Sequence, residues 1–330
     1  MIKAGSNTIG SAIINSSEIV KAYYRGYLVY YKQPEQYIVF VDPLVEQICA
    51  TNWGDGTCIK PSQAARVTDI GTVFNSSAIT SFDEFGEYFT NVASLFGANT
   101  GATAFNSCTG LESITIPSSV TSIGARAFTG CSSLKSIVFP ASVVSFGNNI
   151  LLSCTALDYV EVNSDIQTNN FTSANNSFGS GIGTLLINAN LLVDARYIFG
   201  FNFNTIHVTG NIEDIVNGTR ACFASSNLEK VIIDGNVIRS YTLISGTNIK
   251  FFELGGTYNY MVLPSAGSNI IAHLKYNGVA GTPANIRIAA VSKVYVDSQA
   301  VLNQYLADSA WSSYSAKLDL WENYNGEYKD

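Results

Sequence analysis

The sequence predicts a mainly β protein, an elongated solenoid of roughly nine stacked coils with a parallel concave sheet, helical caps at both ends and a small β module in front. A fixed repeat is the first observation, because Leu111, Leu134 and Leu157 follow one another at intervals of 23 residues. Apolar residues alternate at the end of each repeat, as is typical of strands. Charged residues make up only 13% of the 330 residues, about half the usual globular share.

Residues 1–33 are expected to form the small β module, a possible anchor or oligomerisation segment. Short runs of apolar and aromatic residues occupy 8–14, 19–24 and 27–31, with polar turns between them. β-branched and aromatic runs bounded by turn residues are typical of strands. Residues 32–35 are interpreted as a linker to the rest of the chain.

Residues 34–91 are expected to form an N-terminal helical cap and lead-in. Asp42 is a good helix N-cap, and Pro43 suits the first helical position, where its missing N–H costs nothing. The apolar residues of this helix would share one buried face: Leu44, Val45 and Ile48.

The run around Asp55, Gly-Asp-Gly, resembles the middle of an EF-hand-like calcium loop. Such a loop needs oxygen ligands at positions 1, 3, 5 and 12, the last a bidentate Glu. With Asp55 at position 5, those other positions fall on Thr51, Trp53 and Ser62. The charge that calcium requires is missing, so the loop is interpreted as degenerate and no metal is assigned.

Residues 92–296 are expected to form the solenoid, whose repeat ends in the strand-like pattern Leu-x-x-Ile-x-Ile. The same spacing recurs downstream at 21 or 25 residues, and one further coil is expected near Ile270. A coil of this length buries its apolar face only by stacking on its neighbours. The predicted inward residues downstream are Ile182-Leu185-Ile187, Phe203-Ile206-Val208, Leu228-Val231-Ile233, Ile249-Phe252-Leu254 and Val291-Val294-Val296.

Two further features recur with the repeat. Pro117 and Pro140 close the strand, because proline has no N–H to continue a ladder. Cys108, Cys131 and Cys154 stand at equivalent positions and are expected to stack as buried apolar groups, with disulfides among them as an alternative that the stack does not need.

Residues 297–330 are expected to form a C-terminal helical cap. Asp297 or Ser298 would cap a helix, and the aromatic residues that follow would close the end of the stack as a lid. An aromatic platform for carbohydrate is the alternative. The apolar residues concerned are Val301, Leu302, Tyr305, Leu306, Trp311, Tyr314 and Leu318.

Residues 104–162 follow the pattern L-x-x-I-x-I-P-x-x-V-x-x-I-G-x-x-A-F-x-x-C almost letter for letter. This pattern resembles the BspA-like leucine-rich repeats, first known from surface proteins of anaerobic oral and gut bacteria. The resemblance implies a β-solenoid and a role in adhesion to proteins or cell surfaces.

Residues 1–33 are similar to front segments of phage and prophage structural proteins of the same bacteria. The chain begins with Met and has no unbroken apolar run of the signal-peptide type. A virion protein is released by lysis and needs no leader. A virion or extracellular location is therefore expected, as a tail or fibre component.

The expected function is non-enzymatic interaction or adhesion, with a protein or glycan surface or virion proteins as partner and homo-oligomers possible. The alternative is a bacterial cell-surface or secreted adhesin whose leader was removed, and a polysaccharide-active enzyme is a third possibility. The predicted contact residues on the concave face are Thr115, Val138, Tyr159, Glu161, His207, Lys230, Ile232, Phe251 and Glu253.

Several partner classes are excluded on composition. A net charge of −7 without a Lys/Arg cluster argues against nucleic acid, because binding to phosphates depends on displaced counterions. No run approaches the ~20 apolar residues of a membrane span, so no membrane insertion is expected. Six Cys without a CxxC pair and two His predict no metal site and no cofactor.

Catalysis is not expected either. Polysaccharide cleavage needs two carboxylates within about 5 to 10 Å, yet the predicted coil neighbours of Glu161 are Val138 and Leu186. His207 is interpreted as a surface histidine. The register of the coil that carries His273 is left open, and no Ser or Cys nucleophile accompanies that residue at a recognisable spacing.

Overall fold

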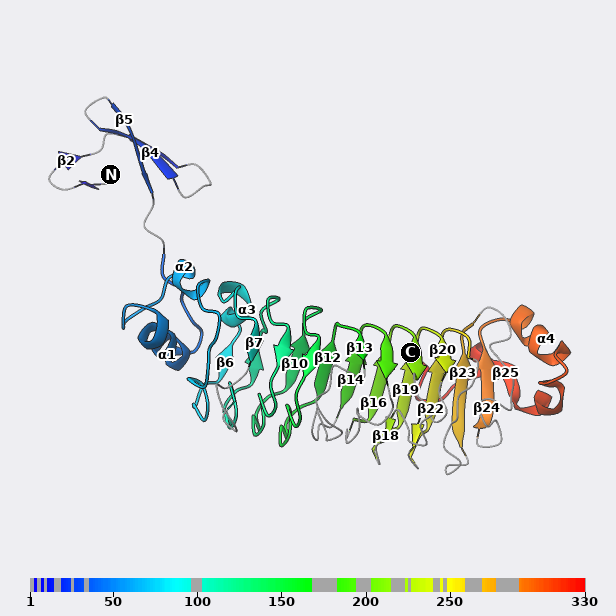
Figure 1. Ribbon diagram of the computed structural model, residues 1–330. Coiled ribbons are helices and arrows are strands. Elements are labelled where there is room, and N and C mark those ends of the chain that lie inside the picture. Colours follow the sequence, from blue (N-terminus) through cyan, green and yellow to red (C-terminus); the bar gives the residue numbers. More distant parts are fainter. Residues whose placement is uncertain are drawn as a thin grey trace.

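The protein is a mainly β chain whose parallel sheets form one β-solenoid (Figure 1). The computed structural model describes the backbone of residues 3–4, 7–8, 11–14, 19–24 and 27–32 and then residues 36–95, 103–167, 183–193, 203–214, 223–224, 227–239, 244–245, 248–258, 269–276 and 291–329. The predicted fold class, including the stack of coils, is confirmed. The number of coils remains a prediction.

The first strands form two small antiparallel sheets. β1 (Lys3–Ala4) pairs with β2 (Asn7–Thr8), and β3 (Ser11–Ile14), β4 (Ile19–Tyr24) and β5 (Tyr27–Lys32) form a meander. Within the described part of the chain these five strands pair only with one another. Whether they constitute a separate domain remains a prediction.

Three short helices precede the main stack: α1 (Pro43–Trp53), α2 (Pro61–Ala64) and α3 (Glu84–Tyr88). Asp42 caps α1 as predicted, since its Oδ1 accepts a 2.8 Å hydrogen bond from the Leu44 N–H. The predicted apolar face is confirmed, because Val45 is buried and Leu44 and Ile48 are half-buried and pack against the same core. Cys49 is also buried on this face.

Short strands open the stack. β6 (Ser81–Phe82) pairs with β8 (Ser113–Ile114), and β7 (Ser94–Leu95), β9 (Ser122–Ile123) and β11 (Ser145–Phe146) form a second parallel sheet. Farther along the stack come a four-stranded parallel sheet and a separate pair of two-residue strands. Their bounds are β13 (Ile166–Gln167), β15 (Leu191–Val193), β17 (Ile212–Asp214), β20 (Val237–Arg239), β18 (Phe223–Ala224) and β21 (Ile244–Ser245).

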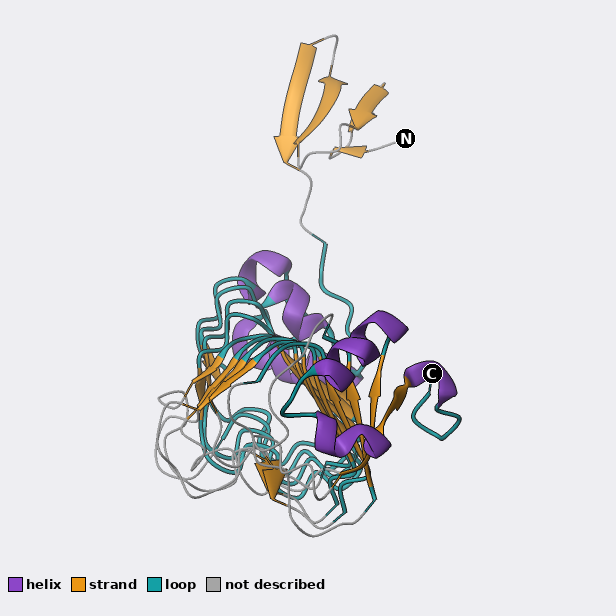
Figure 2. Ribbon diagram, turned by 90° about the vertical axis from the view of Figure 1, so that its right-hand side faces the viewer, coloured by secondary structure: helices purple, strands orange, loops and turns teal. Residues whose placement is uncertain are grey.

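A nine-stranded parallel sheet runs along the stack from β10 to β25, and its strands follow one another in chain order. In the end-on view of Figure 2 it lies on a different side of the coils from the shorter strands. Its strands are β10 (Ser136–Phe139), β12 (Tyr159–Val162), β14 (Thr184–Ile187), β16 (Thr205–Val208), β19 (Lys230–Ile233), β22 (Phe251–Leu254), β23 (Ile270–Leu274), β24 (Val291–Val296) and β25 (Leu318–Leu320).

The predicted inward residues form the core of this stack. Leu111, Leu134 and Leu157 are buried, and so is every described member of the downstream triplets; Ile182 lies outside the described residues. The coil near Ile270 is also confirmed as part of the stack, because β23 pairs with β22 and β24 on its two sides. Leu274 pairs with Leu254, so this coil spans 20 residues instead of 21.

The repeated Phe and Cys positions link successive coils. The rings of Phe74, Phe105 and Phe128 stack in a column with centroids 5.4 and 5.3 Å apart. The thiol of Cys131 donates to the carbonyl of Phe105 at 3.1 Å, and Cys154 repeats this bond one coil later. These thiols are free and buried as predicted, and burial raises the pKa of Cys154 to about 12. Cys222 lies outside the described residues.

At the C-terminal end, Ser298 caps α4 (Gln299–Ala307) by accepting from the Val301 N–H. Val301, Tyr305 and Trp311 are buried in the core of the stack. Leu306, expected on the same face, is 41% exposed and points away. Two short 3₁₀ helices follow, η4 (Ser312–Lys317) before β25 and η5 (Trp321–Asn323) after it. The capping role of the helices at both ends remains a prediction.

Candidate functional site

The outward side of the nine-stranded sheet, here called the front face, carries the candidate site. Side chains alternate between the two faces of a strand, so pairing in register places one row of outward residues beside another. One row is Ser136, Tyr159, Thr184, Thr205, Lys230, Phe251, Ile271 and Lys293. The other is Val138, Glu161, Leu186, His207, Ile232, Glu253, His273, Tyr295 and Asp319.

Eight of the nine predicted contact residues stand in these rows. Thr115 is the exception, because it follows β8 in the coil before β10, where it is exposed and its N–H donates to the Phe82 carbonyl. The structure therefore brings together residues that are far apart in sequence, as the repeat predicted. It does not leave them equally accessible.

The C-terminal segment, residues 321–329, covers the half of the front face nearest to β25. Phe251 and Tyr295 point outward, yet they are only 1% and 8% exposed. The ring of Tyr328 stacks on Phe251 at 4.8 Å, and Trp321 meets the Tyr295 ring at 5.8 Å. The prediction that Phe251 is an exposed contact residue is thus corrected, because the chain's own end returns over it.

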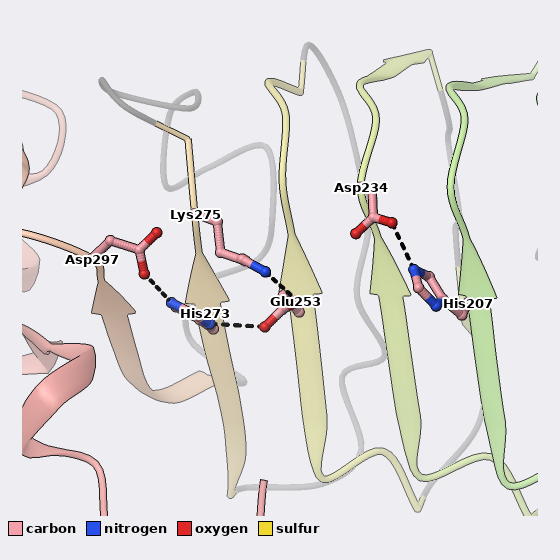
Figure 3. A network of polar contacts seen from close by, with 6 residues as sticks. All are labelled: His207, Asp234, Glu253, His273, Lys275 and Asp297. Atoms are coloured by element: carbon pink, nitrogen blue, oxygen red, sulfur yellow. Dashed lines mark hydrogen bonds and ion pairs between the residues drawn. The ribbon is translucent and has the colours of Figure 1, made fainter. Parts of the chain in front are cut away.

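A buried histidine, His273, lies under this cover, and Figure 3 shows its polar contacts with Glu253 and Asp297. His273 is 2% exposed, and its ring stacks on Trp321 with centroids 3.9 Å apart and planes 9° from parallel. Its Nδ1 lies 2.9 Å from Glu253 Oε2 and its Nε2 lies 2.7 Å from Asp297 Oδ1. A ring that carries a hydrogen on each nitrogen can donate to both carboxylates at once.

Glu253 also meets a lysine. Lys275 Nζ donates to Glu253 Oε1 at 3.2 Å. Burial by itself would raise the pKa of Glu253, but the hydrogen bond from His273 and the charge of Lys275 outweigh burial and hold the pKa below its ordinary value. This network was not found from the sequence. The signal was present, since Glu253, His273 and Asp297 are spaced by about one coil each.

The half of the front face on β10, β12, β14 and β16 is not covered by the C-terminal segment, and we call it the open surface. Val138 on β10 is 42% exposed, and Leu186 on β14, two strands away, is half-buried. Its outward residues are Ser136, Val138, Tyr159, Glu161, Thr184, Leu186, Thr205 and His207.

Polar side chains on the open surface hold one another. The Tyr159 hydroxyl donates to Glu161 Oε2 at 2.8 Å. Burial, together with this hydrogen bond, raises the pKa of Tyr159 to about 12. His207 Nε2 lies 2.7 Å from Oδ2 of Asp234, the residue that directly follows the neighbouring strand β19 (Figure 3). The mixture of aliphatic, aromatic and internally paired polar groups is typical of a contact surface.

Lys230 and Ile232 mark the border between the two halves. Lys230 Nζ lies 5.5 Å from the ring centre of Phe251 and 5.9 Å from that of Tyr328, within cation–π range. Both predicted contact residues on β19 therefore adjoin the covered half. Only Val138, Tyr159, Glu161 and His207 among the nine belong to the open surface.

The surroundings of Glu161 limit what chemistry this surface can perform. Its neighbours in register are Val138 and Leu186, as predicted. The described residues contain no group of three or more His, Cys, Asp or Glu side chains arranged to hold a metal ion. Among the helices that the structure describes, none has the length and apolar character to cross a bilayer.

A comparison with protein families identifies the repeat. Residues 98–217 match the BspA type leucine-rich repeat region in six copies. The match includes the coils that carry most of the open surface, and it does not reach residues 1–33. No curated protein matches the chain.

Proposed function

We propose that this chain is a non-enzymatic interaction protein that binds a protein or glycan on a cell surface through the open surface of its nine-stranded sheet. The single observation that carries the proposal is Val138, an aliphatic side chain that is 42% exposed on a sheet whose other half the chain itself covers. A sheet face that is covered at one end and leaves an aliphatic side chain exposed at the other favours a partner for the open end. The BspA type repeat also suggests an interaction or adhesion role.

Binding is favoured over catalysis by the partners of the polar groups. Glu161 has aliphatic neighbours on both adjacent strands. His207 Nε2 is paired with Asp234 Oδ2 at 2.7 Å, so this nitrogen already has a carboxylate partner. A polysaccharide-active enzyme would need a second carboxylate beside Glu161, and the register offers none.

We also propose that the chain works at the exterior of a particle or cell. In one form, residues 1–33 anchor it in a virion as a tail or fibre component, and the front face meets the host. In the other form, the same front face belongs to a bacterial cell-surface or secreted adhesin. Both forms use the open surface in the same way.

A pair of matched substitutions tests the binding surface. Val138 is 42% exposed on the open surface, whereas Val144 is 58% exposed next to β11, outside the nine-stranded sheet. Binding of the labelled protein would be measured on intact bacterial and epithelial cells and on a glycan array. Where the wild type binds, Val138→Arg should weaken binding at least about tenfold, and Val144→Arg should not, because only Val138 lies in the proposed contact.

Equal losses for the two variants would contradict the proposal, as would a wild type retained on none of these surfaces. Treating the cells with protease or with periodate distinguishes the partners. Loss of binding after protease indicates a protein partner, and loss after periodate indicates a glycan.

A further inference from the structure

The covered half of the front face is built from outward-facing rings on consecutive strands. Phe251 comes from β22, His273 from β23 and Tyr295 from β24. Each is less than a tenth exposed, although each points away from the core of the stack. Three neighbouring rings on a sheet face would be unfavourable in contact with water. The segment that covers them, residues 321–329, therefore indicates what kind of ligand they bind.

The occupant is the end of the chain, which begins with the 3₁₀ helix η5 and places three aromatic side chains against these rings: Trp321, Tyr324 and Tyr328. Trp321 lies between His273 and Tyr324, at 3.9 and 4.8 Å, in a nearly parallel column. Tyr328, seven residues from Trp321, stacks on Phe251 with planes 19° apart. The indole and the phenol thus occupy separate places on adjacent strands.

Side-chain contacts, rather than backbone pairing, keep this segment on the sheet. In the described part of the chain, the hydrogen bonds of residues 321–329 close within residues 319–329, as in Tyr324 N–H to the Trp321 carbonyl. Backbone pairing with the sheet ends at β25. A segment held by ring contacts can leave without breaking a strand from the sheet.

The site also selects for a flat ring. The His273 ring is fixed in its plane because each of its nitrogens faces a carboxylate, from Glu253 and from Asp297. A flat aromatic face can lie against it over its whole area, whereas a branched aliphatic side chain cannot. Lys230 Nζ adds a cation over the second place, which favours an aromatic ring there too.

We propose that Phe251, His273 and Tyr295 form a binding site for a polypeptide that presents an indole and a phenol side chain, and that residues 321–329 are an internal ligand which such a partner displaces. The proposal rests on the proposed function, since it adds a second contact to the same front face. The C-terminal segment and the partner would then compete for the same site.

The test uses the full chain with Trp321→Ala and Tyr328→Ala, which empties both places without shortening the protein. The probe is a synthetic nonapeptide with the sequence of residues 321–329, WENYNGEYK, labelled with fluorescein. Fluorescence polarisation should show saturable binding to the double variant. The wild type should bind at least about tenfold more weakly, because its own segment competes at an effective concentration on the order of millimolar.

Two controls identify the contacts. A peptide with leucine in place of its Trp and its last Tyr should lose binding, and so should the double variant that also carries Phe251→Leu. The absence of saturable binding to a double variant with an unchanged circular dichroism spectrum would overturn the proposal. Equal binding of the leucine peptide would overturn it too, since the site would then take any apolar segment.

Val138→Arg separates this proposal from the proposed function. Added to the double variant, it should leave peptide affinity unchanged, because Val138 lies on β10 at the far end of the sheet. If the peptide fails to bind while Val138→Arg still abolishes binding to cells, only the peptide site is wrong. If the peptide binds and Val138→Arg has no effect on cells, only the open surface is wrong.

Discussion

Asparagine side chains form hydrogen bonds between successive coils at one turn of the solenoid. Asn190 Oδ1 accepts from the Asn211 N–H at 2.9 Å, Asn211 Oδ1 accepts from the Asn236 N–H at 2.8 Å, and Asn236 repeats the bond to Thr257. Asp165 begins the ladder by accepting from the Asn190 N–H. Each bond satisfies a backbone donor that the neighbouring turn leaves free.

Asn211→Ala should lower the free energy of unfolding by about 1 to 3 kcal/mol, because a part-buried N–H loses its acceptor. Urea denaturation followed by circular dichroism measures the change. Asn204→Ala is the matched control, since Asn204 is exposed and a substitution of this kind typically changes stability by less than about 0.5 kcal/mol. Equal effects of the two substitutions would mean that the ladder does not stabilise the stack.

Among the elements, α1 shows how a helix end is tied to the first coils. The carboxylate of Asp42 caps the helix with Oδ1 and accepts from the Thr80 hydroxyl with Oδ2 at 2.8 Å. Burial by itself would raise the pKa of Asp42, but the hydrogen bonds from Thr80 and Leu44 outweigh it and hold the pKa below its ordinary value. One charged group therefore serves both the helix and the loop before β6.

Asp42→Ala should lower the free energy of unfolding by about 1 to 2 kcal/mol at pH 7, as expected for loss of an N-cap. Because the folded-state pKa is lowered, the contribution of the carboxylate is complete above the unfolded pKa, near 3.9, and is lost as the pH falls through the folded value. The gap in thermal midpoint between wild type and variant should therefore narrow below about pH 4.

Asp42→Asn serves as the control for charge, since it retains one side-chain oxygen as a cap acceptor. We expect its stability at pH 7 to fall between those of the wild type and Asp42→Ala. A gap that stays constant down to pH 2 would contradict the assignment of the effect to the ionised carboxylate.

At the scale of the whole molecule, the chain consists of an N-terminal set of strands, a stack of coils and an end that returns over the stack. The strands β1–β5 pair among themselves in the described part of the chain. The coils share one continuous core from Ile38 to Leu318. The stack of coils therefore has a core of its own, which is a source of stability.

Deleting residues 1–33 should leave the circular dichroism spectrum and thermal midpoint of the solenoid unchanged while abolishing incorporation into virions. The measurement is the amount of the chain in purified particles, compared with full-length chain carrying Val138→Arg, which should incorporate normally. Normal incorporation of the deleted chain would refute virion anchoring by these residues.

The repeat made most of the fold predictable. Leu111, Leu134 and Leu157 recur at a fixed interval because each coil must bury the same position against the next. The repeat length and the inward residues could therefore be predicted from the sequence alone. Outward residues followed from alternation, and eight of nine stand in the two rows of the front face. The apolar face of α1 followed from spacing too, since Leu44, Val45 and Ile48 all pack against the core.

The sequence by itself determined the solenoid, its inward rungs and the order of its strands, because those depend on local spacing repeated many times. Only the tertiary structure decided which part of the front face is open. Trp321 stacks on His273 and Tyr328 stacks on Phe251, although these pairs lie about fifty to eighty positions apart in the sequence. No repeat in the sequence predicts these contacts. Ring contacts of this kind depend on where the C-terminal segment lies once the stack has formed. The spacing of residues along the sequence does not predict that position.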